Sequence, residues 1–324
     1  MSRALICGIS GQDGAYLARL LLEKGYEVIG TSRDAMATSF ANLAKLGIRD
    51  KVKTVSMAIN DFRSVLQTLT IAWPDEIYNL SGQSSVGLSF EQPVETMESI
   101  GIATLNFLEA IRFMGKPVKF YNAGSSECFG DTGETLADEQ TAFRPQSPYA
   151  VAKSSAYWMV ANYREAYELF ACTGILFNHD SPLRPERFVT QKVVRAAARI
   201  ASGSREKLFL GNLEIHRDWG WAPEYVEAMW LMLQQKQAED FVIATGRSVS
   251  LNYFVEKSFA KFGLDWECHV ESDPSLLRPT DILVGKANPG KAANILGWRA
   301  KTDVDAVIER MCDAAFTDKA GNNA

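Results

Sequence analysis

Short apolar runs alternate with amphipathic segments along the first half of the chain. The apolar runs fit buried strands, whereas the segments between them repeat apolar residues at helical spacing, as Leu17, Leu20 and Leu21 do. This pattern predicts strands at Ala4–Cys7, Glu27–Thr31, Val52–Val55, Glu76–Leu80, Val118–Asn122 and Thr173–Phe177. It predicts helices over Ala15–Lys24 and Asp61–Ala72, within Val94–Met114, and from Pro148 to about Phe170.

Strands that alternate with helices indicate a parallel sheet with helices on both faces. We therefore expect an α/β fold with a Rossmann-type, doubly wound parallel sheet. The alternation breaks after Phe177, where we place a domain boundary, and residues 222–247 return to the sheet through a helix and a strand. The first domain then covers residues 1–177 with 222–247, and residues 178–324, mainly 178–221 and 248–324, form a smaller α/β lobe.

Three glycines follow the first predicted strand and open the first predicted helix. Gly8, Gly11 and Gly14 are spaced three apart, wider than in the standard dinucleotide fingerprint. At this place glycines permit a tight turn and a close approach of the backbone to a pyrophosphate. An ordinary turn is the alternative. After the second strand, Arg33 favours the extra phosphate of NADP, and Asp34 keeps NAD open because an acidic residue there holds a ribose.

Composition excludes several classes of protein. The 324 residues are 47% apolar, and 34 basic against 39 acidic residues form no long run of charge, so we expect no nucleic-acid partner and no membrane partner. Five scattered cysteines without a Cys-x-x-Cys motif argue against a disulfide framework, and His179 and His216 lack metal-ligand spacing, so we expect no metal. No signal peptide or membrane span is recognisable, which predicts a cytoplasmic protein.

Two serine-rich segments follow neighbouring strands of the predicted sheet. Ser81–Ser85 comes after the fourth strand and Gly124–Glu127 after the fifth. Loops of this composition are often only turns, but the carboxyl ends of parallel strands share one edge of the sheet with the glycine turn. The sequence therefore predicts a ligand site at that edge.

Tyr149 and Lys153 lie four residues apart in a segment that begins with Ser147 and Pro148. At that spacing they share one face of a helix, and Pro148 suits its first turn. An adjacent ammonium lowers the pKa of a phenol, so Tyr149 is a candidate proton acceptor. A packed ring beside a solvated amine is the alternative interpretation of the same spacing.

Taken together, these features resemble the extended short-chain dehydrogenase/reductases, and among them the GDP-mannose 4,6-dehydratase family. The resemblance covers almost the whole chain. Its segments are Gly8–Leu17, Gln83–Pro93, Ser125–Gly130, Ser147–Lys153, Ile175–Pro182, Phe188–Lys192, Gly211–Gly220 and Tyr225–Gln234.

The resemblance implies transient transfer of a hydride from sugar carbon 4 to bound NADP, loss of water across carbons 5 and 6, and return of the hydride to carbon 6. Tyr149 would deprotonate the hydroxyl on carbon 4, and Lys153 would lower the pKa of Tyr149 and hold the nicotinamide ribose. Glu127 would remove the proton on carbon 5. Ser125 would hydrogen-bond the oxygen on carbon 4.

The resemblance also implies two sets of binding residues. The cofactor would contact Gly8, Ser10, Gly11, Gln12, Asp13, Gly14, Arg33, Leu80, Gly82, Tyr149, Lys153 and His179. Arg217 and Arg278 would bind the diphosphate of a nucleotide sugar, because a guanidinium can engage phosphate through two donors. The remaining substrate-binding residues would be Ser84, Ser126, Asn178, Val189, Lys192 and Asn212.

The chain departs from the family at a few positions. An arginine pair followed by a serine-rich loop is replaced by Arg33–Asp34 and residues 35–40, so NAD stays open beside NADP, and a homodimer beside a homotetramer. Ala58, Asp180, Pro185 and Leu283 stand where relatives carry other residues, so a different nucleotide sugar stays an alternative substrate.

Glu127 favours a dehydratase over the other functions of this fold. Epimerases and reductases need only the tyrosine, the lysine and the serine, whereas elimination of water needs one more acid or base. A nucleotide-sugar 4-epimerase or 4-keto reductase is the alternative enzyme. A binding protein that has lost the chemistry is the alternative of another class, and the joint presence of Ser125, Glu127, Tyr149 and Lys153 argues against it.

Overall fold

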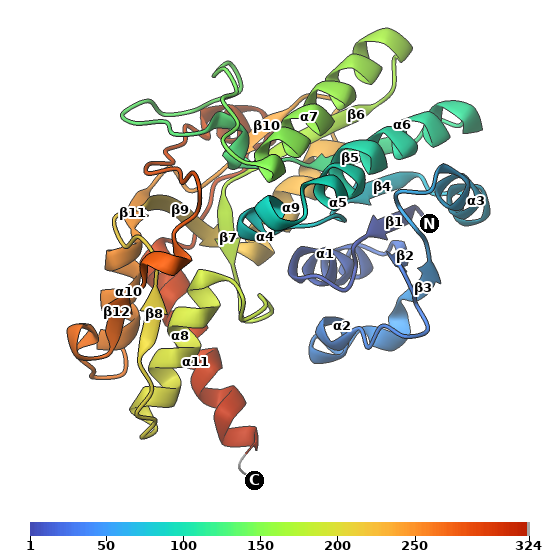
Figure 1. The fold of residues 1–324 in the computed structure, drawn as a ribbon. Helices are drawn as coiled ribbons and strands as arrows, with labels where there is room; N and C mark the ends of the chain where they lie inside the picture. Colours follow the sequence, from blue (N-terminus) through green and yellow to red (C-terminus); the bar gives the residue numbers. More distant parts are fainter. Residues whose placement is uncertain (323–324) are drawn as a thin grey trace.

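A seven-stranded parallel sheet forms the centre of the molecule. The computed structural model describes residues 1–322, with side chains as far as Thr317. The strand order of the sheet is β10-β6-β5-β4-β1-β2-β3 (Figure 1). The strands are β1 (Arg3–Cys7), β2 (Glu27–Ser32), β3 (Lys53–Ser56), β4 (Glu76–Asn79), β5 (Lys119–Ala123), β6 (Ala171–Leu176) and β10 (Phe241–Ile243). The predicted fold class is confirmed.

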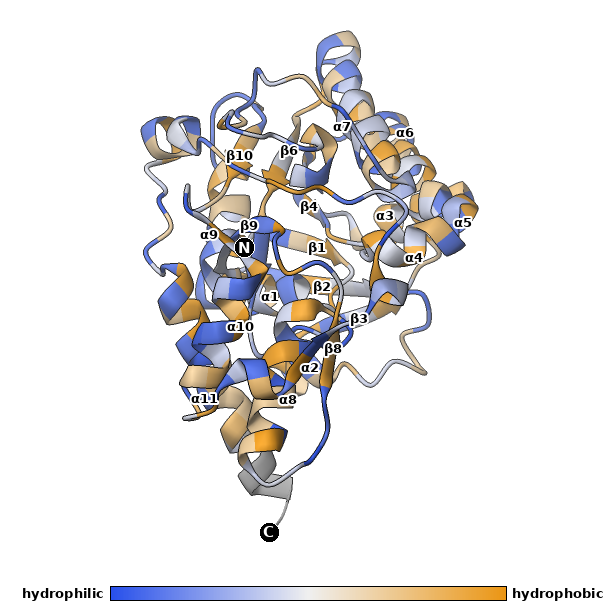
Figure 2. Ribbon diagram, turned by 60° about the vertical axis from the view of Figure 1, so that its left-hand side comes forward, coloured by the Kyte–Doolittle hydropathy of each residue, from blue (hydrophilic) through white to orange (hydrophobic). Residues whose placement is uncertain are grey.

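Two helical layers cover the sheet. Successive side chains of a buried strand point to opposite faces of the sheet, so both faces are apolar and each needs a covering layer. Ala4 and Ile6 of β1 belong to one apolar core, and Leu5 and Cys7 belong to another. The first core includes α1 (Gln12–Glu23) and α9 (Ala222–Leu233). The second includes α3 (Phe62–Ala72), α6 (Ala103–Met114) and α7 (Pro148–Tyr167). Strand β10, which packs between these layers, is strongly hydrophobic in Figure 2.

A smaller lobe packs beside the carboxyl ends of the sheet. One of its sheets has the order β11-β9-β7, and β12 pairs with β8 in another. Its strands are β7 (Asn178–Asp180), β8 (Leu208–Leu210), β9 (His216–Trp221), β11 (Ser248–Ser250) and β12 (Val270–Ser272). Its helices α8 (Val189–Ala201), α10 (Leu251–Ala260) and α11 (Val304–Asn322) enclose an apolar core of their own.

Shorter elements complete the fold. They are α2 (Ala41–Lys45), α4 (Val86–Glu91), α5 (Pro93–Met97), the π-helical turns Glu98–Ile102 and Ala292–Leu296, and the 3₁₀ turns Arg49–Lys51, Ser126–Phe129, Trp266–Cys268 and Pro274–Leu276. Within residues 1–322, none of the helices is both long and apolar enough to span a bilayer.

The chain returns to the central sheet after the first part of the smaller lobe. Helix α9 packs on α1, and β10 pairs with β6 at the edge of the sheet. Strands β7 and β9 lie in segments that show no period-2 pattern, because they are short and mix polar with aromatic residues. The division of the chain into two domains stays a prediction.

Candidate functional site

A cavity of about 400 Å³ lies between the carboxyl ends of the central strands and the smaller lobe. Its wall contains Ser125, Glu127, Tyr149 and Lys153, the predicted catalytic residues. It also contains the predicted substrate residues Ser84, Ser126, Asn178, Val189, Lys192, Asn212, Arg217 and Arg278. Of the predicted cofactor residues, Asp13, Leu80, Gly82, Tyr149, Lys153 and His179 line it. The roles of these residues stay predictions, but the fold brings them to one place.

Helix α7 positions Tyr149 and Lys153. Its N-terminus is fixed by Ser147, whose Oγ accepts a hydrogen bond of 3.1 Å from the amide of Ala150, and by Pro148 in the first turn. Lys153 donates from Nζ to the carbonyl of Ala123 at 2.7 Å, and Nζ lies 5.8 Å from the centre of the Tyr149 ring. The lysine is therefore anchored to the end of β5, directly beside the phenol.

Burial is the largest influence on the pKa values of Tyr149 and Lys153. It raises the pKa of Tyr149, although a hydrogen bond with Ser125 acts in the opposite direction. It also lowers the pKa of Lys153 to about 8, because a buried ammonium loses its hydration. Desolvation of the phenolate is the larger effect in this structure, and the lowering of the Tyr149 pKa by Lys153 stays a prediction.

Glu127 belongs to the 3₁₀ turn Ser126–Phe129 that follows β5. Ser125 caps this turn, since its Oγ accepts a 3.3 Å hydrogen bond from the amide of Glu127. Burial raises the pKa of Glu127, whereas the charges of Arg217 and Arg278 oppose that rise. A partly desolvated carboxylate beside a partly buried tyrosine can take a proton from a carbon acid and return it to a leaving hydroxyl.

Arg217 and Arg278 meet at one carboxylate. Arg217 on β9 is buried, and its Nη2 lies 3.5 Å from Oδ1 of Asp281. Nη1 of Arg278 lies 3.6 Å from the same oxygen. The segment that carries Arg278 and Asp281 is tied to the chain just before α7, because Thr280 donates a hydrogen bond to the carbonyl of Gln146. Two cations on one wall of the cavity suit an anionic group such as a diphosphate.

Sequence reasoning missed several residues in the wall of this cavity. Arg184 and Arg187 both lie over the ring of Phe188, with guanidinium carbons 3.9 Å and 4.9 Å from its centre. Asp281 was missed as well. The available signal was the group of arginines close to Asn178 and Lys192, but nothing local shows that this irregular segment turns back toward the sheet.

The glycine turn is packed too closely for side chains. A Cβ at Gly14 would lie 2.5 Å from the carbonyl oxygen of Gly8. Gly8 has φ of +85°, and a Cβ there would meet the carbonyl oxygen of Leu80 at 2.8 Å. Gly11 precedes α1 and makes no side-chain cap, so backbone amides at this N-terminus can face an anion. The turn therefore fits a dinucleotide pyrophosphate.

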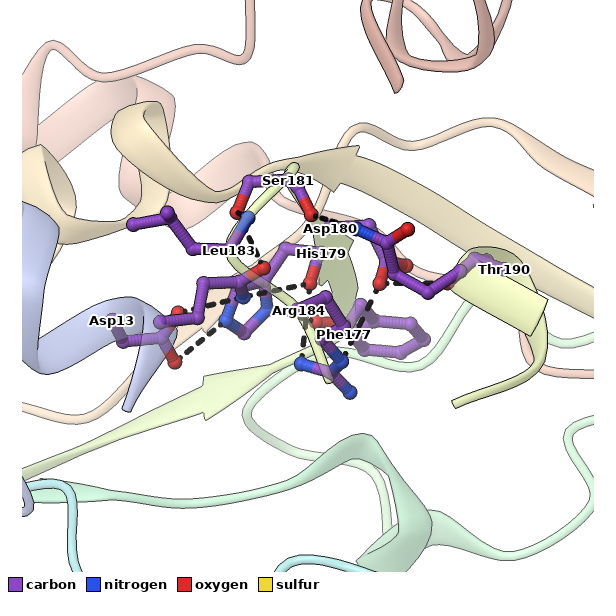
Figure 3. A network of polar contacts seen from close by, with 10 residues as sticks. Asp13, Phe177, His179, Asp180, Ser181, Leu183, Arg184 and Thr190 are labelled. Atoms are coloured by element: carbon purple, nitrogen blue, oxygen red, sulfur yellow. Dashed lines mark hydrogen bonds and ion pairs between the residues drawn. The ribbon is translucent and has the colours of Figure 1, made fainter. Parts of the chain in front are cut away.

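Asp13 and His179 join the glycine turn to β7 through buried polar contacts (Figure 3). Nε2 of His179 lies 2.9 Å from Oδ2 of Asp13, and Gln12 donates from Nε2 to the carbonyl of His179 at 3.2 Å. Burial alone would raise the pKa of Asp13 and lower that of His179, but their mutual attraction outweighs burial and reverses both shifts. The pair thus fixes the two halves of the cavity relative to each other.

Arg33 lies outside this cavity, at the end of β2. Its side chain is 86% exposed, and its guanidinium lies 3.8 Å from the carboxylate of Glu95 on α5. Gly8, Ser10, Gly11, Gln12 and Gly14 also lie outside the residues that line the cavity. They surround the N-terminus of α1 instead.

Comparison with protein families gives one match over nearly the whole chain. The family described as GDP-mannose 4,6 dehydratase matches residues 5–311. "GDP-mannose 4,6 dehydratase 1" of Arabidopsis thaliana is 45% identical over 320 residues, which cover 96% of this chain and 88% of that protein.

Solved structures with the same fold include two kinds of enzyme. A dTDP-glucose 4,6-dehydratase from Bacillus anthracis in complex with NAD aligns with a TM-score of 0.86 at 18% identity, covering 99% of this chain and 98% of the other. A UDP-glucose 4-epimerase from Thermotoga maritima with UDP-glucose also aligns with a TM-score of 0.86, at 21% identity, covering 98% and 99%. At such identities the likeness shows the fold alone.

Proposed function

The chain belongs to the GDP-mannose 4,6-dehydratase family, and we propose that it is a hydro-lyase that converts GDP-mannose to GDP-4-keto-6-deoxymannose. The observation that carries the proposal is the place of Glu127 in the same cavity as Tyr149 and Lys153. An epimerase or a reductase has no use for this additional acid or base. The family match and Glu127 together favour the dehydratase over those alternatives.

Different residues of the cavity would carry out different steps of the reaction. Tyr149 takes the proton of the hydroxyl on carbon 4, assisted by Ser125 and Lys153. A nicotinamide dinucleotide, which the glycine turn and Lys153 would hold, would supply the hydride chemistry between carbon 4 and carbon 6. Glu127 takes the proton from carbon 5, acidified by the new ketone, and protonates the hydroxyl on carbon 6 so that water leaves. A proton returned to carbon 5 completes the product, and no reducing equivalent is consumed.

We propose NADP as the cofactor, with NAD as the alternative. The glycine turn and the amides at the start of α1 would hold the pyrophosphate, and Lys153 would hold the nicotinamide ribose. Arg33 supports NADP because its guanidinium is exposed directly after β2, where a ribose phosphate would lie. His179 and Asp13 would border the cofactor from the side of β7.

We also propose a homodimer or homotetramer in the cytoplasm. Exposed apolar side chains of α5 and α7, among them Val94 and Trp158, support self-association. The compartment would be reducing, because the five cysteines are free thiols: Cys7, Cys128, Cys172, Cys268 and Cys312.

The dinucleotide-binding domain would consist of residues 1–177 with 222–247, which the pairing of β10 with β6 supports. Residues 178–324 would form the nucleotide-sugar lobe.

Incubation of the purified protein with GDP-mannose tests the proposed function. We expect a 4-keto-6-deoxy product by mass spectrometry without added NADPH, and loss of product in Glu127→Gln. Stoichiometric consumption of reduced cofactor would refute a dehydratase. A Glu127→Gln variant that dehydrates at the wild-type rate would remove Glu127 from the mechanism.

A further inference from the structure

Four charged side chains form one wall of the cavity, and we refer to them as the charged wall. Glu127 follows β5, Arg217 lies on β9, and Arg278 and Asp281 lie after the 3₁₀ turn Pro274–Leu276. Two positive and two negative groups balance one another in a partly desolvated place. Segments distant in sequence supply them, so the arrangement exists only in the folded chain.

Asp281 holds both arginines loosely. Its Oδ1 lies 3.5 Å from Arg217 and 3.6 Å from Arg278, whereas a strong charge-assisted hydrogen bond measures about 2.7–2.9 Å. Arg217 also donates to the carbonyl of His216 at 3.0 Å, which orients its guanidinium. Both arginines line the cavity, and their long contacts with Asp281 can give way to a ligand there.

A diphosphate that binds these arginines changes the electrostatic surroundings of Glu127. The diphosphate adds ~2 negative charges to this wall. In the free protein, the positive charges of Arg217 and Arg278 stabilise the Glu127 carboxylate. Because the site is partly buried, solvent screens these charges weakly. The Glu127 carboxylate then loses stabilisation at the moment the sugar arrives.

We propose, on the basis of the function proposed above, that the diphosphate of the nucleotide sugar activates Glu127, by drawing Arg217 and Arg278 onto itself and so making Glu127 a stronger base in the substrate complex than in the free protein. Efficient proton abstraction from carbon needs a base whose proton affinity is matched to the operating pH. The same binding energy that holds the nucleotide thus improves the base at the sugar.

Any test must distinguish proton uptake by Glu127 from proton uptake by the other titratable groups near it. Tyr149 on α7 and Cys128 on the same 3₁₀ turn interact electrostatically with Glu127, Lys153 lies beside Tyr149, and Asp281 is the second carboxylate of the wall. Asp13 and His179 lie farther along the cavity, where the side chains pair with each other. Asp281 is the critical control, because the same two arginines also pair with its carboxylate.

Calorimetric titration of Tyr149→Phe with GDP-mannose measures this proton directly, since that variant lacks the phenol and leaves the sugar unreacted. Titrations in two buffers of different ionisation enthalpy, from about pH 5 to about pH 7, give the number of protons bound with the ligand. We expect uptake of up to about one proton per site. It should persist in Tyr149→Phe/Asp281→Asn and vanish in Tyr149→Phe/Glu127→Gln.

Each other outcome overturns the inference. Binding without proton uptake, uptake that survives Glu127→Gln, or uptake that depends on Asp281 would show that Glu127 does not respond to the diphosphate. These results leave the dehydratase itself intact, because wild-type turnover of GDP-mannose is measured separately. Absence of that turnover would defeat the proposed function, and the inference with it.

A kinetic measurement on the wild-type protein covers the case in which a variant fails to fold. The acid limb of kcat/KM reports the free protein, and that of kcat reports the substrate complex. Glu127 must be deprotonated to act as a base, so a more basic Glu127 places the acid limb of kcat at higher pH than that of kcat/KM. Coincident limbs, or the reverse order, would contradict the inference.

Discussion

At the scale of single residues, Lys153, a predicted catalytic residue, lowers the stability of the folded protein. Its ammonium is buried and held by one carbonyl, that of Ala123. The pKa of Lys153 falls from 10.5 unfolded to about 8 folded, so the folded state binds the proton less well. The penalty is complete below about pH 8 and disappears as the pH rises toward about 10.5.

Lys153→Met should therefore stabilise the cofactor-stripped protein while abolishing turnover. We expect a gain of about 2 kcal/mol in the free energy of unfolding at neutral pH, partly offset by the lost hydrogen bond to Ala123. The gain should shrink as the pH approaches about 10. Urea denaturation measures it. Lys192→Met, a lysine whose Nζ is exposed, is the matched control and should change stability little. A less stable Lys153→Met protein would contradict the explanation.

We expect Arg33 to be the side chain that distinguishes NADP from NAD. Replacement by alanine should weaken the binding of NADP about tenfold or more and leave the binding of NAD nearly unchanged, because only NADP carries the phosphate that a guanidinium would bind. Fluorescence titration of both nucleotides checks this. Equal losses for the two would show that Arg33, which contacts Glu95, acts only on the structure of its loop.

At the scale of elements, the turn between β1 and α1 depends on the absence of a side chain. Gly14→Ala should destabilise the protein by about 2 kcal/mol or more, because the added Cβ meets the backbone of Gly8 and Ile9, which cannot move aside cheaply. Gly87→Ala is the matched control, since its Cβ finds only Ser85 Oγ at 4.0 Å and α4 gains a better helix former. Thermal denaturation compares the two, and equal melting temperatures would count against close packing of the turn.

At the scale of the whole molecule, we expect the outer surface of α5 and α7 to form a contact between subunits. Val151 and Trp158 are seven residues apart and share one face of α7, where Trp158 is 62% exposed. Trp158→Glu should reduce the mass of the assembly measured by light scattering. Ile71→Glu, at an exposed position of α3, should leave that mass unchanged. If Trp158→Glu retains the wild-type mass, this surface is not the interface.

The parts of the candidate site also differ in whether the sequence alone could predict them. The glycine turn and the pair Tyr149 and Lys153 could be predicted, because one turn or one helix face contains all their members. Asp281 could not be predicted, since it reaches Arg217 across 64 residues. The contact of Asp13 with His179 spans 166 residues and was equally hidden. No periodicity records such a contact, because packing of separate elements creates it.

The sequence by itself determined the parallel sheet, its covering helices and the types of reacting group, because hydrophobic period and short motifs are local properties of a chain. The tertiary structure alone decided what surrounds those groups. It buried Lys153, and Tyr149 in part, so that desolvation is the largest influence on their pKa values. It also set Glu127 against two arginines from the smaller lobe, because protonation depends on the charge and solvent around a group in three dimensions.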